Sequence, residues 1–577
     1  MRWNLKPPPN SKIKAHLTEV LGVPSVIAHL LAQRGIETFE AAKDFFRSHW
    51  GQLHDPFLMK DMELAVTRLE KAITQKEKIM VFGDYDVDGT TAVTLITHYL
   101  RSMSANATPY IPDRYKEGYG LSKEGIDLAI SEGMTLLICL DCGIKAVDLV
   151  GYAQENGIDV VICDHHTPGA TLPKAHAVLD PKRPDCTYPF KGLCGCGVAF
   201  KLIQAHTEQR GESPETLQAY LDLVATATAA DIVPLEGENR VLTYLGLQVL
   251  NATPRPGLEV LIGERTSRSL NVSDMVFRIA PRINAAGRMK HATHAVDLLL
   301  CTDRAQVQVH AEAIETFNAQ RKELDSAITQ QALDQIAASD DQNKSATVVF
   351  DPNWHKGVIG IVASRLTETY YRPTVVFTQS GAQLAASVRS VRGFDVYAAL
   401  EACSEHMIQF GGHKYAAGLT ILPDQYLSFK QAFERQVAQT LMPEQKIPSL
   451  EIDVEVKLSD LTPKLYRIIE QMGPFGPGNM RPVFMASDVR DAGSVRCVGS
   501  DQSHLKAAFV STQNKSIDAI GFGMGASLEL VENQKSCSVA FVLDENEWNG
   551  QKRLQMRLKG IREGATPTDF LQPPRPK

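Results

Sequence analysis

The sequence contains no apolar run that approaches the roughly 18 residues of a membrane-spanning helix. The stretch from Met1 to Pro9 also lacks the apolar core of a secretory signal peptide. Cysteines are scarce, with 10 in 577 residues, and they form no paired C-x-x-C framework. Zinc stays open only as an alternative, carried by Cys142, Cys186, Cys194 and Cys196. We therefore expect a cytoplasmic protein with no membrane association.

A basic excess is missing as well. The net charge of -7 excludes a chain that binds nucleic acid with its whole surface, although it leaves room for a local basic channel. With 44% hydrophobic and 22% charged residues, the composition is that of an ordinary globular protein. Its length is enough for about three or four domains.

Three aspartates stand at alternate positions in the stretch Gly83-Asp-Tyr-Asp-Val-Asp-Gly-Thr-Thr91. They follow the apolar run Ile79–Phe82, which predicts a buried strand that ends in a loop. Alternate residues of an extended chain point to one side, so we expect Asp84, Asp86 and Asp88 to converge on one small volume. Hard cations between the three carboxylates would relieve their repulsion, which favours a metal site.

The residues after the aspartates predict the start of a helix. We expect Gly89 to let the chain turn and Thr90 or Thr91 to cap the helix that follows. An Asp-rich surface turn or a calcium loop is the alternative. The EF-hand pattern requires a glutamate at the place where Leu95 stands, which disfavours that kind of calcium loop.

Similar polar residues follow other predicted elements. Asp141 comes after the apolar run Leu136–Leu140, and Asp164, His165 and His166 follow the run that ends at Cys163, while Asp231 ends the helix-like stretch Leu221–Ala230. Strands and helices alternate from about residue 55 to 180, which predicts a doubly wound parallel sheet with ligands beyond the carboxyl ends of its strands. Carboxylates and imidazoles in such places suit Mn²⁺ or Mg²⁺, so we predict a centre of two metal ions.

A basic stretch, Phe277 to His291, contains no acidic residue. Its small residues and glycine would allow the backbone to approach a phosphate chain, and Arg278, Arg282, Asn284 and Arg288 would then contact nucleic acid. A solvated loop is the alternative interpretation, and the sequence does not decide between the two.

The second half of the chain predicts three further parts. A long polar helix follows Asp303 to about residue 340, and a second α/β unit begins with a strand at Ala346–Phe350. In that unit Ser387, Arg389 and His413 offer donors to a phosphate, and Gly411 and Gly412 offer backbone amides. Short alternating strands follow from about residue 448, with a hairpin turn at 548–551.

These motifs carry a family resemblance. Residues 83–91, Asp141-Cys-Gly143 and Asp164-His-His166 resemble the signatures of the DHH phosphoesterase superfamily. With residues 278–289 and Met472-Gly-Pro-Phe-Gly-Pro-Gly-Asn479, the chain is similar to the RecJ family of bacterial single-strand-specific 5′ to 3′ DNA exonucleases. The resemblance implies that Asp86, Asp88, Asp141, His165 and Asp231 hold the metals and act in catalysis. It places Asp84 at or beside the ions, and Asp164 and the catalytic His166 next to them.

The resemblance also implies the division of the chain. We expect a DHH domain with a doubly wound parallel sheet, a long helix that joins it to a DHHA1 α/β domain, and a β-barrel OB-fold domain. The expected boundaries are an N-terminal extension at 1–50, the DHH catalytic domain at 51–300, the connecting helix at 301–342, the substrate-binding DHHA1 domain at 343–445, the nucleic-acid-binding OB fold at 446–565 and a disordered tail at 566–577.

We expect the enzyme to release 5′-mononucleotides from single-stranded DNA in recombination and repair, including mismatch repair. A pocket for the 5′-terminal phosphate would be formed by Arg114 with the donors of the DHHA1 domain, although Arg114 has a surface ion pair with Glu117 as its alternative. The resemblance implies a single-strand-binding protein and a DNA helicase as partners. A small-molecule phosphoesterase, such as a pyrophosphatase or cyclic-dinucleotide hydrolase, and a non-catalytic replication scaffold are the rival functions.

Overall fold

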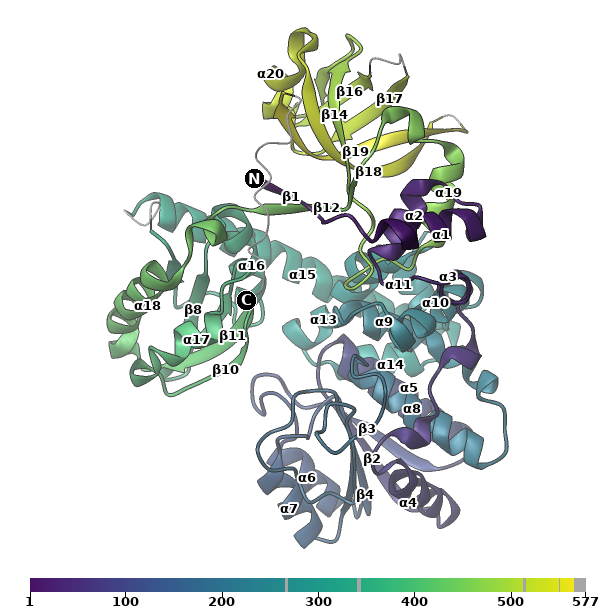
Figure 1. Ribbon diagram of the computed structural model, residues 1–577. Helices are drawn as coiled ribbons and strands as arrows, with labels where there is room; N and C mark the ends of the chain where they lie inside the picture. The colour runs from purple at the N-terminus through teal and green to yellow at the C-terminus, as the bar shows by residue number, and fades with distance from the viewer. Residues whose placement is uncertain (265–267, 340–343, 512–514, 549, 565–577) are drawn as a thin grey trace. The chain divides into compact units, whose positions relative to one another are not determined.

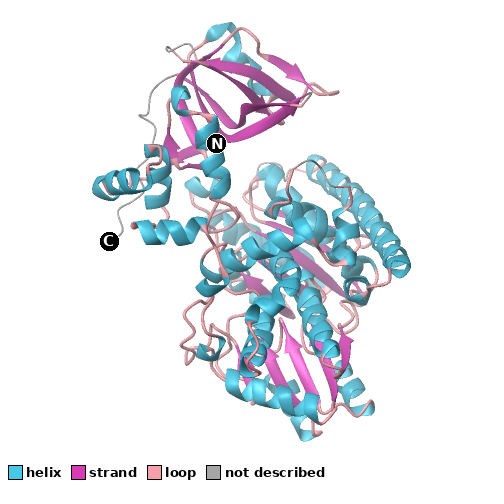
Figure 2. Cartoon of the chain, turned by 90° about the vertical axis from the view of Figure 1, so that its right-hand side faces the viewer, coloured by secondary structure: helices cyan, strands magenta, loops and turns pink. Residues whose placement is uncertain are grey.

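The computed structural model describes residues 1–264, 268–339, 344–511, 515–548 and 550–564. The chain divides into two compact units (Figures 1 and 2). One consists of residues 48–446 and 476–478, and the other of residues 1–47, 447–475 and 479–577. Within the described residues, no helix combines the length and the apolar character that a membrane span requires.

The first unit begins with a sheet of five parallel strands in the order β3-β2-β4-β5-β6. The strands are β2 (Lys78–Gly83), β3 (Asn106–Tyr110), β4 (Leu136–Leu140), β5 (Asp159–Cys163) and β6 (Ala177–Leu179). From β2 the chain passes first to β3 on one side and then to β4 on the other, so the winding reverses between β2 and β4. This doubly wound sheet confirms the predicted one, and its switch point is where such sheets bind ligands.

Helices cover both faces of this sheet, as the lower part of Figure 1 shows. Ile79 and Val81 of β2 share a core with α4 (Met62–Thr74), α5 (Val87–Ser102) and α8 (Gly195–Gln209). Met80 and Phe82 pack instead with α6 (Lys123–Ser131) and α7 (Val147–Glu155). Because both faces are covered, β2, β4 and β5 are nearly continuous apolar runs, whereas the edge strand β3 is partly exposed.

A helical region follows the sheet. It comprises α9 (Leu221–Ala230), α10 (Gly237–Ala252), α11 (Pro256–Ile262), α12 (Val272–Asp274), a π-helical turn at Met275–Ile279, α13 (Ala280–Met289), α14 (Thr293–Leu300) and α15 (Arg304–Ala337). The basic stretch is therefore largely helical, and its interpretation as a solvated loop was wrong. The long helix that was expected after Asp303 is α15.

The second α/β sheet of this unit has the order β10-β11-β9-β8-β7. Only β7 and β8 pair in parallel, and the other pairs are antiparallel. Its strands are β7 (Thr347–Phe350), β8 (Thr374–Ser380), β9 (Gln383–Arg389), β10 (Gln409–His413) and β11 (Ala416–Ile421), with helices α16 (Ile359–Tyr370), α17 (Val396–Glu401) and α18 (Tyr426–Thr440).

The other compact unit contains both the beginning and the end of the chain. Strand β1 (Arg2–Leu5) pairs in parallel with β12 (Ser449–Ile452), and helices α1 (Ser11–Leu21), α2 (Ser25–Ala32) and α3 (Phe39–Phe46) follow. Leu17 of α1 and Leu30 of α2 are buried in one cluster with Phe484 and Phe541 of the C-terminal part. The N-terminal residues are thus part of the C-terminal core.

A seven-stranded sheet completes this unit in the order β13-β14-β18-β19-β17-β16-β15. Its elements are β13 (Val454–Glu455), α19 (Pro463–Gln471), β14 (Phe484–Asp491), β15 (Arg496–Val498), β16 (His504–Val510), β17 (Ser516–Gly521), α20 (Leu528–Val531), β18 (Cys537–Trp548) and β19 (Gln551–Glu563). An additional pairing of β14 with β16 joins the five central strands into a closed ring.

The predicted hairpin at 548–551 joins β18 to β19, because Trp548 pairs with Gln551. Asn549 and the Pro-rich tail, which was expected to be disordered, lie outside the described residues. The short strands expected from about residue 448 begin with β12 and β13. Asp453 between them accepts hydrogen bonds from the Val483 amide and the Lys6 ammonium group.

Candidate metal centre

The predicted metal ligands come together at the switch point of the parallel sheet. They come from the ends of four elements and the first turn of a fifth: Asp84 and Asp86 after β2, Asp88 in α5, Asp141 after β4, Asp164, His165 and His166 after β5, and Asp231 after α9. The ligand atoms form three overlapping groups, and within each group they lie within 4.8 Å of one another. The groups are Asp84, Asp86 and Asp141; Asp88, His165 and Asp231; and Asp141, His165 and His166.

The expected reason for the convergence of the first three aspartates was wrong. The chain does not remain extended through them, because α5 begins at Val87 and Asp88 lies in its first turn. Asp86 is the N-cap of α5, and its Oδ1 atom accepts a hydrogen bond from the Gly89 amide at 3.1 Å. Asp84 and Asp86 therefore approach Asp141, whereas Asp88 joins a different group.

The residues after Asp88 also differ from expectation. Gly89 lies inside α5 and makes no turn; a Cβ there would lie 2.3 Å from the carbonyl oxygen of Asp84, so only glycine permits this packing. Thr90 and Thr91 do not cap the helix. Their hydroxyl groups donate to the carbonyl oxygens of Asp86 and Val87, one turn earlier, at 2.6 and 2.7 Å.

The carboxylate of Asp88 is held by the N-terminus of α8. The amides of Gly195 and Cys196 donate to its two oxygens at 2.6 and 2.7 Å. These amides have no partners within their own helix, and the positive end of the helix dipole favours a negative charge there. Asp88 is 2% exposed, so the helix N-terminus fixes one ligand of the centre from inside the core.

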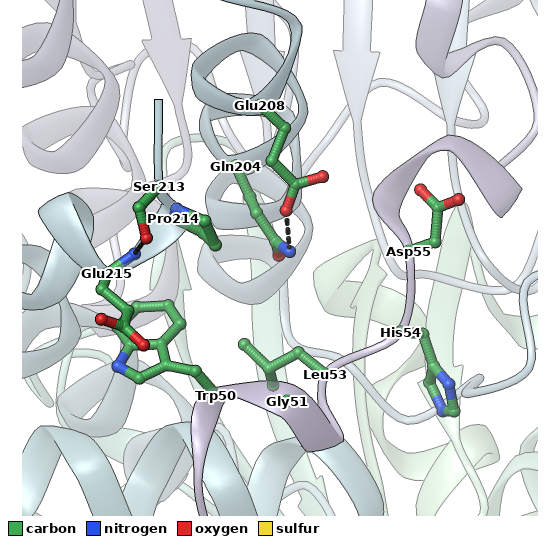
Figure 3. Close-up of a pocket in the computed structure, with 10 residues that line it drawn as sticks. All are labelled: Trp50, Gly51, Leu53, His54, Asp55, Gln204, Glu208, Ser213, Pro214 and Glu215. Atoms are coloured by element: carbon green, nitrogen blue, oxygen red, sulfur yellow. Dashed lines mark hydrogen bonds between the residues drawn. The ribbon is translucent and has the colours of Figure 1, made fainter. Parts of the chain in front are cut away.

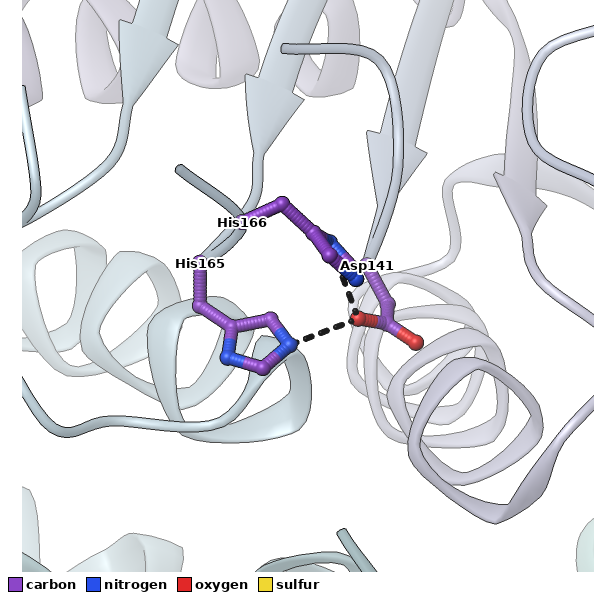
Figure 4. Close-up of side chains that lie close together, drawn as sticks. All are labelled: Asp141, His165 and His166. Carbon is purple, nitrogen blue, oxygen red and sulfur yellow. Dashed lines mark ion pairs between the residues drawn. The ribbon is translucent and has the colours of Figure 1, made fainter. Parts of the chain in front are cut away.

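Asp141 lies close to both histidines of the cluster, as Figure 4 shows. Its Oδ1 atom is 3.1 Å from Nε2 of His165 and 3.9 Å from Nδ1 of His166. Its backbone has a φ of 57°, in the left-handed region that aspartate and asparagine tolerate better than other non-glycine residues. Gly195 packs so tightly against it that a Cβ there would be 2.6 Å from the Asp141 Cβ.

The two histidines have different surroundings. Nε2 of His165 faces the carboxylates of Asp88 and Asp231 at 3.8 and 3.7 Å. His166 instead uses Nδ1 to contact Asp164 at 2.7 Å, and its Nε2 lies 3.0 Å from the Tyr119 hydroxyl. His166 is thus fixed at both ring nitrogens, while His165 presents Nε2 to the acidic cluster.

Burial changes the acidity of these groups. Burial and then the nearby Asp86 raise the pKa of Asp84, and burial with Asp88 raises the pKa of Asp141. Burial and Asp88 raise the pKa of Asp231 to about 9. Burial would also raise the pKa of Asp164, but its hydrogen bond and charge interaction with His166 lower it to about 2. Asp164 is the one carboxylate of this set with its own cationic partner.

The cluster fits hard divalent cations. Both carboxylate oxygens of Asp84, Oδ1 of Asp141 and Nδ1 of His165 are buried, and they have no hydrogen-bond partner in the described part of the chain. Buried anions without a partner are costly, and a cation bound to them would remove this cost. Oxygen ligands with one or two imidazoles are the donors that Mn²⁺ and Mg²⁺ accept.

A cavity of about 500 Å³ lies next to Asp84 and Asp86. Six of the residues predicted to bind substrate line it: Arg114, Asn284, Arg288, Arg389, Gly411 and Gly412. The guanidinium group of Arg114 lies over the Tyr85 ring, 4.4 Å from its centroid. Glu117, the alternative partner of Arg114, instead accepts hydrogen bonds from Tyr110, Ser122 and the Asp113 amide.

Four predicted substrate residues do not line this cavity. Ser387 and His413 belong to the neighbouring strands β9 and β10 but are not part of its wall. Arg278 donates to the Glu264 carbonyl and lies 3.6 Å from Asp274. Arg282 pairs with Glu315 of α15. The contacts of Arg278 and Arg282 join helices to one another. They explain the positions of both side chains without a bound nucleic acid.

Three residues of the region were not predicted. Tyr119 contacts His166, and Tyr85 supports Arg114; both lie in loops after strands, where only their aromatic character stood out. Asp180 follows β6, is buried, and has its pKa raised to about 7 by burial. The rule that selected Asp141 and Asp164, an aspartate directly after a buried strand, would have selected Asp180 as well.

Comparison with known proteins places these features in a family. The models for the DHH family N-terminal domain, the DHHA1 domain and the RecJ OB domain match residues 78–228, 342–439 and 452–560. The single-stranded-DNA-specific exonuclease RecJ of Bacillus subtilis (strain 168) is 37% identical to this chain, in a match that covers 97% of the chain and 70% of that protein. RecJ of Escherichia coli (strain K12) is 33% identical, with 93% and 96% covered.

The chain belongs to the RecJ family. A crystal structure of RecJ from Thermus thermophilus in complex with Mn²⁺ superposes with a TM-score of 0.84 at 30% identity, over 98% of this chain and 80% of that one. A second structure of RecJ from the same organism contains Mg²⁺. The family models confirm the three predicted kinds of domain, DHH, DHHA1 and OB, in the predicted order.

Proposed function

We propose that this RecJ-family protein is a metal-dependent exonuclease that hydrolyses single-stranded DNA from its 5′ end and releases 5′-mononucleotides. The observation that supports this most directly is the acidic cluster at the switch point with an arginine-lined cavity beside it. A cluster of this kind activates a hydrolytic reaction, and the adjacent guanidinium groups suit the phosphates of a nucleic acid.

Two groups of residues would hold the ions. Asp84, Asp86 and Asp141 form one candidate site, and Asp88, His165 and Asp231 form the other. Two Mn²⁺ or Mg²⁺ ions bound there would activate water and stabilise the charge on the leaving 3′-oxygen. Asp141 is close to both sites, because its Oδ1 atom also contacts His165.

The protein's own groups would position this centre. The amides at the N-terminus of α8 fix Asp88. Asp164 fixes Nδ1 of His166, whose Nε2 atom faces Tyr119. A histidine held in this way keeps its orientation as substrate enters, and such supporting contacts tune neighbouring ligands.

The cavity would hold the terminal phosphate. Arg114, Arg288 and Arg389 approach it from three different segments of the chain. Burial, and then the nearby Arg114 and Arg389, lower the pKa of Arg288 to about 10, so the guanidinium groups destabilise one another until an anion joins them. A phosphate that bears two negative charges suits this cluster.

The rest of the chain would add further contacts to the substrate. We assign catalysis to the DHH domain at 51–300 and substrate binding to the DHHA1 domain at 343–445, with the helix at 301–342 as their connection. We assign additional single-strand binding to the OB domain at 446–565. Oligonucleotide-binding folds combine a basic groove with aromatic side chains on which bases stack. Recruitment by a single-strand-binding protein and a helicase in recombination and repair stays a prediction.

The decisive experiment uses end-labelled oligonucleotides. A single strand labelled at its 3′ end should be shortened step by step from the 5′ end with Mn²⁺ or Mg²⁺, and chelator should stop the reaction. A 5′ label should appear at once as mononucleotide. Preferential hydrolysis of cyclic dinucleotides or pyrophosphate would favour the small-molecule phosphoesterase, and no hydrolysis of any of these substrates with either ion would favour the scaffold.

A further inference from the structure

A second cavity, of about 430 Å³, shares no lining residue with the arginine-lined one. Figure 3 shows the residues that line it. Trp50, Leu53 and Asp55 come from the segment before α4, Gln204 and Glu208 project from α8, and Glu215 closes another side. None of these residues belongs to the acidic cluster or to the arginine-lined cavity. The proposed hydrolysis therefore makes no use of these side chains.

Gln204 provides the first indication of a ligand. The side chain is only 4% exposed, and its Nε2 atom donates to Oε1 of Glu208 at 2.9 Å. That hydrogen bond fixes the orientation of the amide, because a carboxylate can only accept. The Oε1 atom of Gln204 is buried and has no partner in the described part of the chain. A buried acceptor of this kind costs free energy unless a donor reaches it.

The lining indicates that the donor is a cation. Asp55, Glu208 and Glu215 bring three carboxylates to the cavity. Among the described residues that line it, no lysine or arginine occurs, and no ion pair joins any of these three carboxylates to a described basic residue. Trp50 adds an aromatic ring that is partly exposed. A planar guanidinium group satisfies all of these features, since it stacks on indole and presents five donors.

The surroundings favour a protein as the carrier of that group. Phe57 and Leu58, two and three residues after Asp55, are 39% and 45% exposed. The amide of Phe57 donates to Asp55 at 2.9 Å, which fixes the start of this apolar turn relative to the cavity wall. Exposed apolar side chains around a polar pocket are typical of a protein interface. A small hydrophilic solute would not bury them.

We propose that this cavity receives an arginine side chain of a partner protein, with Gln204 and Glu208 as acceptors and Trp50 against the guanidinium plane. The pocket stands apart from the metals: Gln204 lies nine residues beyond Gly195 in α8, which is about 13 Å along the helix axis. Occupation of the cavity would therefore anchor a partner to the enzyme without blocking the substrate.

The test uses the full-length protein and a dye-labelled peptide with one arginine between apolar residues. Binding is measured by fluorescence anisotropy, and a lysine version of the peptide and spermidine serve as competitors. We expect saturable binding that is at least about tenfold weaker in Glu208→Gln and Gln204→Leu, as loss of a charge-assisted or buried hydrogen bond would give. The exposed Glu215→Gln is a further variant with less risk to folding.

The matched control is Glu155→Gln, which removes an exposed carboxylate from the end of α7. It should bind the arginine peptide like wild type, and all four variants should hydrolyse single-stranded DNA at the wild-type rate. Equal affinity in the pocket variants and wild type would overturn the proposal, as would the absence of saturable binding. Competition by spermidine or the lysine peptide as strong as that by the arginine peptide would refute an arginine-specific protein site.

Discussion

At the scale of single residues, Asp141 shows how backbone and side chain are matched to one task. Its left-handed backbone turns the carboxylate back toward His165, and this conformation suits few side chains other than aspartate, asparagine and glycine. Asp88 reaches the neighbouring group from a regular helix and is fixed by amides instead. The two aspartates therefore differ in how they are held, although both have the same proposed role.

Replacing either carboxylate by an amide tests that role with little strain. Asp141→Asn keeps a residue that tolerates the φ of 57°, and Asp88→Asn retains the size of the side chain. We expect each variant to lose at least about 100-fold in the rate of DNA hydrolysis, or about 2.7 kcal/mol of activation free energy. Thermal unfolding should stay close to wild type. Asp148→Asn on α7 is the control, and comparable rates in all three variants would contradict the assignment.

The raised pKa of Asp231 predicts how stability depends on pH. A carboxyl group whose pKa is about 9 in the folded protein and about 3.9 in the unfolded chain stabilises the fold at low pH. This contribution falls as the pH rises from about 4 to 9, because over this range the unfolded chain loses the proton while the folded protein keeps it. Metal binding displaces the proton and relieves the charge.

We therefore expect the gain in Tm from Mn²⁺ to be larger at pH 8 than at pH 6. The measurement is thermal unfolding with Mn²⁺ and with chelator at both values. In Asp231→Asn the dependence on pH should be weaker, since this variant has no carboxyl group to titrate. A gain in Tm that is the same at both pH values in wild type would contradict this account.

The arginines of the cavity predict sensitivity to the 5′ group. Arg114→Ala and Arg389→Ala should each cost about 1.5–3 kcal/mol of binding to a 5′-phosphorylated strand, as for a hydrogen bond to a charged group. Metal binding should change little. The rates on 5′-phosphate and 5′-hydroxyl oligonucleotides should thus differ less in the variants than in wild type. The control is Arg304→Ala, because the Arg304 side chain is far more exposed than the cavity arginines. If the ratio of the rates on 5′-phosphate and 5′-hydroxyl strands is unchanged in both cavity variants, the phosphate binds elsewhere.

At the scale of elements, the apolar runs predicted the parallel sheet because its central strands are buried on both faces. The expected runs Ile79–Phe82 and Leu136–Leu140 lie in β2 and β4, the run that ends at Cys163 is β5, and the aspartates after these strands pointed to their carboxyl ends. Local sequence propensity does not predict a strand that is stabilised by contacts distant in the sequence. Nothing local marks Arg2–Leu5 as a strand, since its one partner among the described residues is β12, some 447 residues later.

The basic stretch left a phosphate-binding segment and a solvated loop as open alternatives, and its helical structure excludes the loop. Its small residues serve helix packing. Gly287 lets α13 approach the loop after β2, where a Cβ would come within 2.8 Å of the Tyr85 carbonyl oxygen. Arg278 and Arg282 contact helices, and of the three arginines only Arg288 reaches the cavity. The spacing of the charges in the sequence does not predict this difference.

The N-terminus of α8 is the element that a small change would disturb most selectively. In Gly195→Ala the new methyl group would lie 2.6 Å from the Asp141 Cβ, so one of them must move. In Gly197→Ala the new methyl group meets the side chains of Leu193 and Cys194 at 3.3 Å or more, and the change removes a flexible residue from the same helix. We expect Gly195→Ala to reduce the hydrolysis rate at least about tenfold through misplacement of a ligand, while Gly197→Ala stays near wild type. Similar rates in both variants would contradict this role of the close approach.

At the scale of the whole molecule, the two ends of the chain fold together. Residues 1–47 supply Leu17, Ile27, Leu30 and Leu31, all with no exposed surface, to the cluster that contains Phe484 and Phe541 of the OB domain. The catalytic unit contains the metal cluster, both α/β sheets and both cavities. The N-terminal extension is therefore part of the structure around the OB domain.

This arrangement predicts how the protein can be divided. Removing residues 447–577 alone would uncover the four aliphatic side chains of 1–47, each worth about 1.5–3 kcal/mol when buried, and we expect that fragment to aggregate. The fragment 48–446 lacks both parts and should be monodisperse by size-exclusion chromatography. It should bind Mn²⁺ and hydrolyse short oligonucleotides, but bind long single strands more weakly than the full chain. The salt dependence of that binding should be less steep, because fewer phosphates are contacted. A soluble fragment 1–446 together with an insoluble fragment 48–446 would show that the N-terminal residues support the catalytic unit instead.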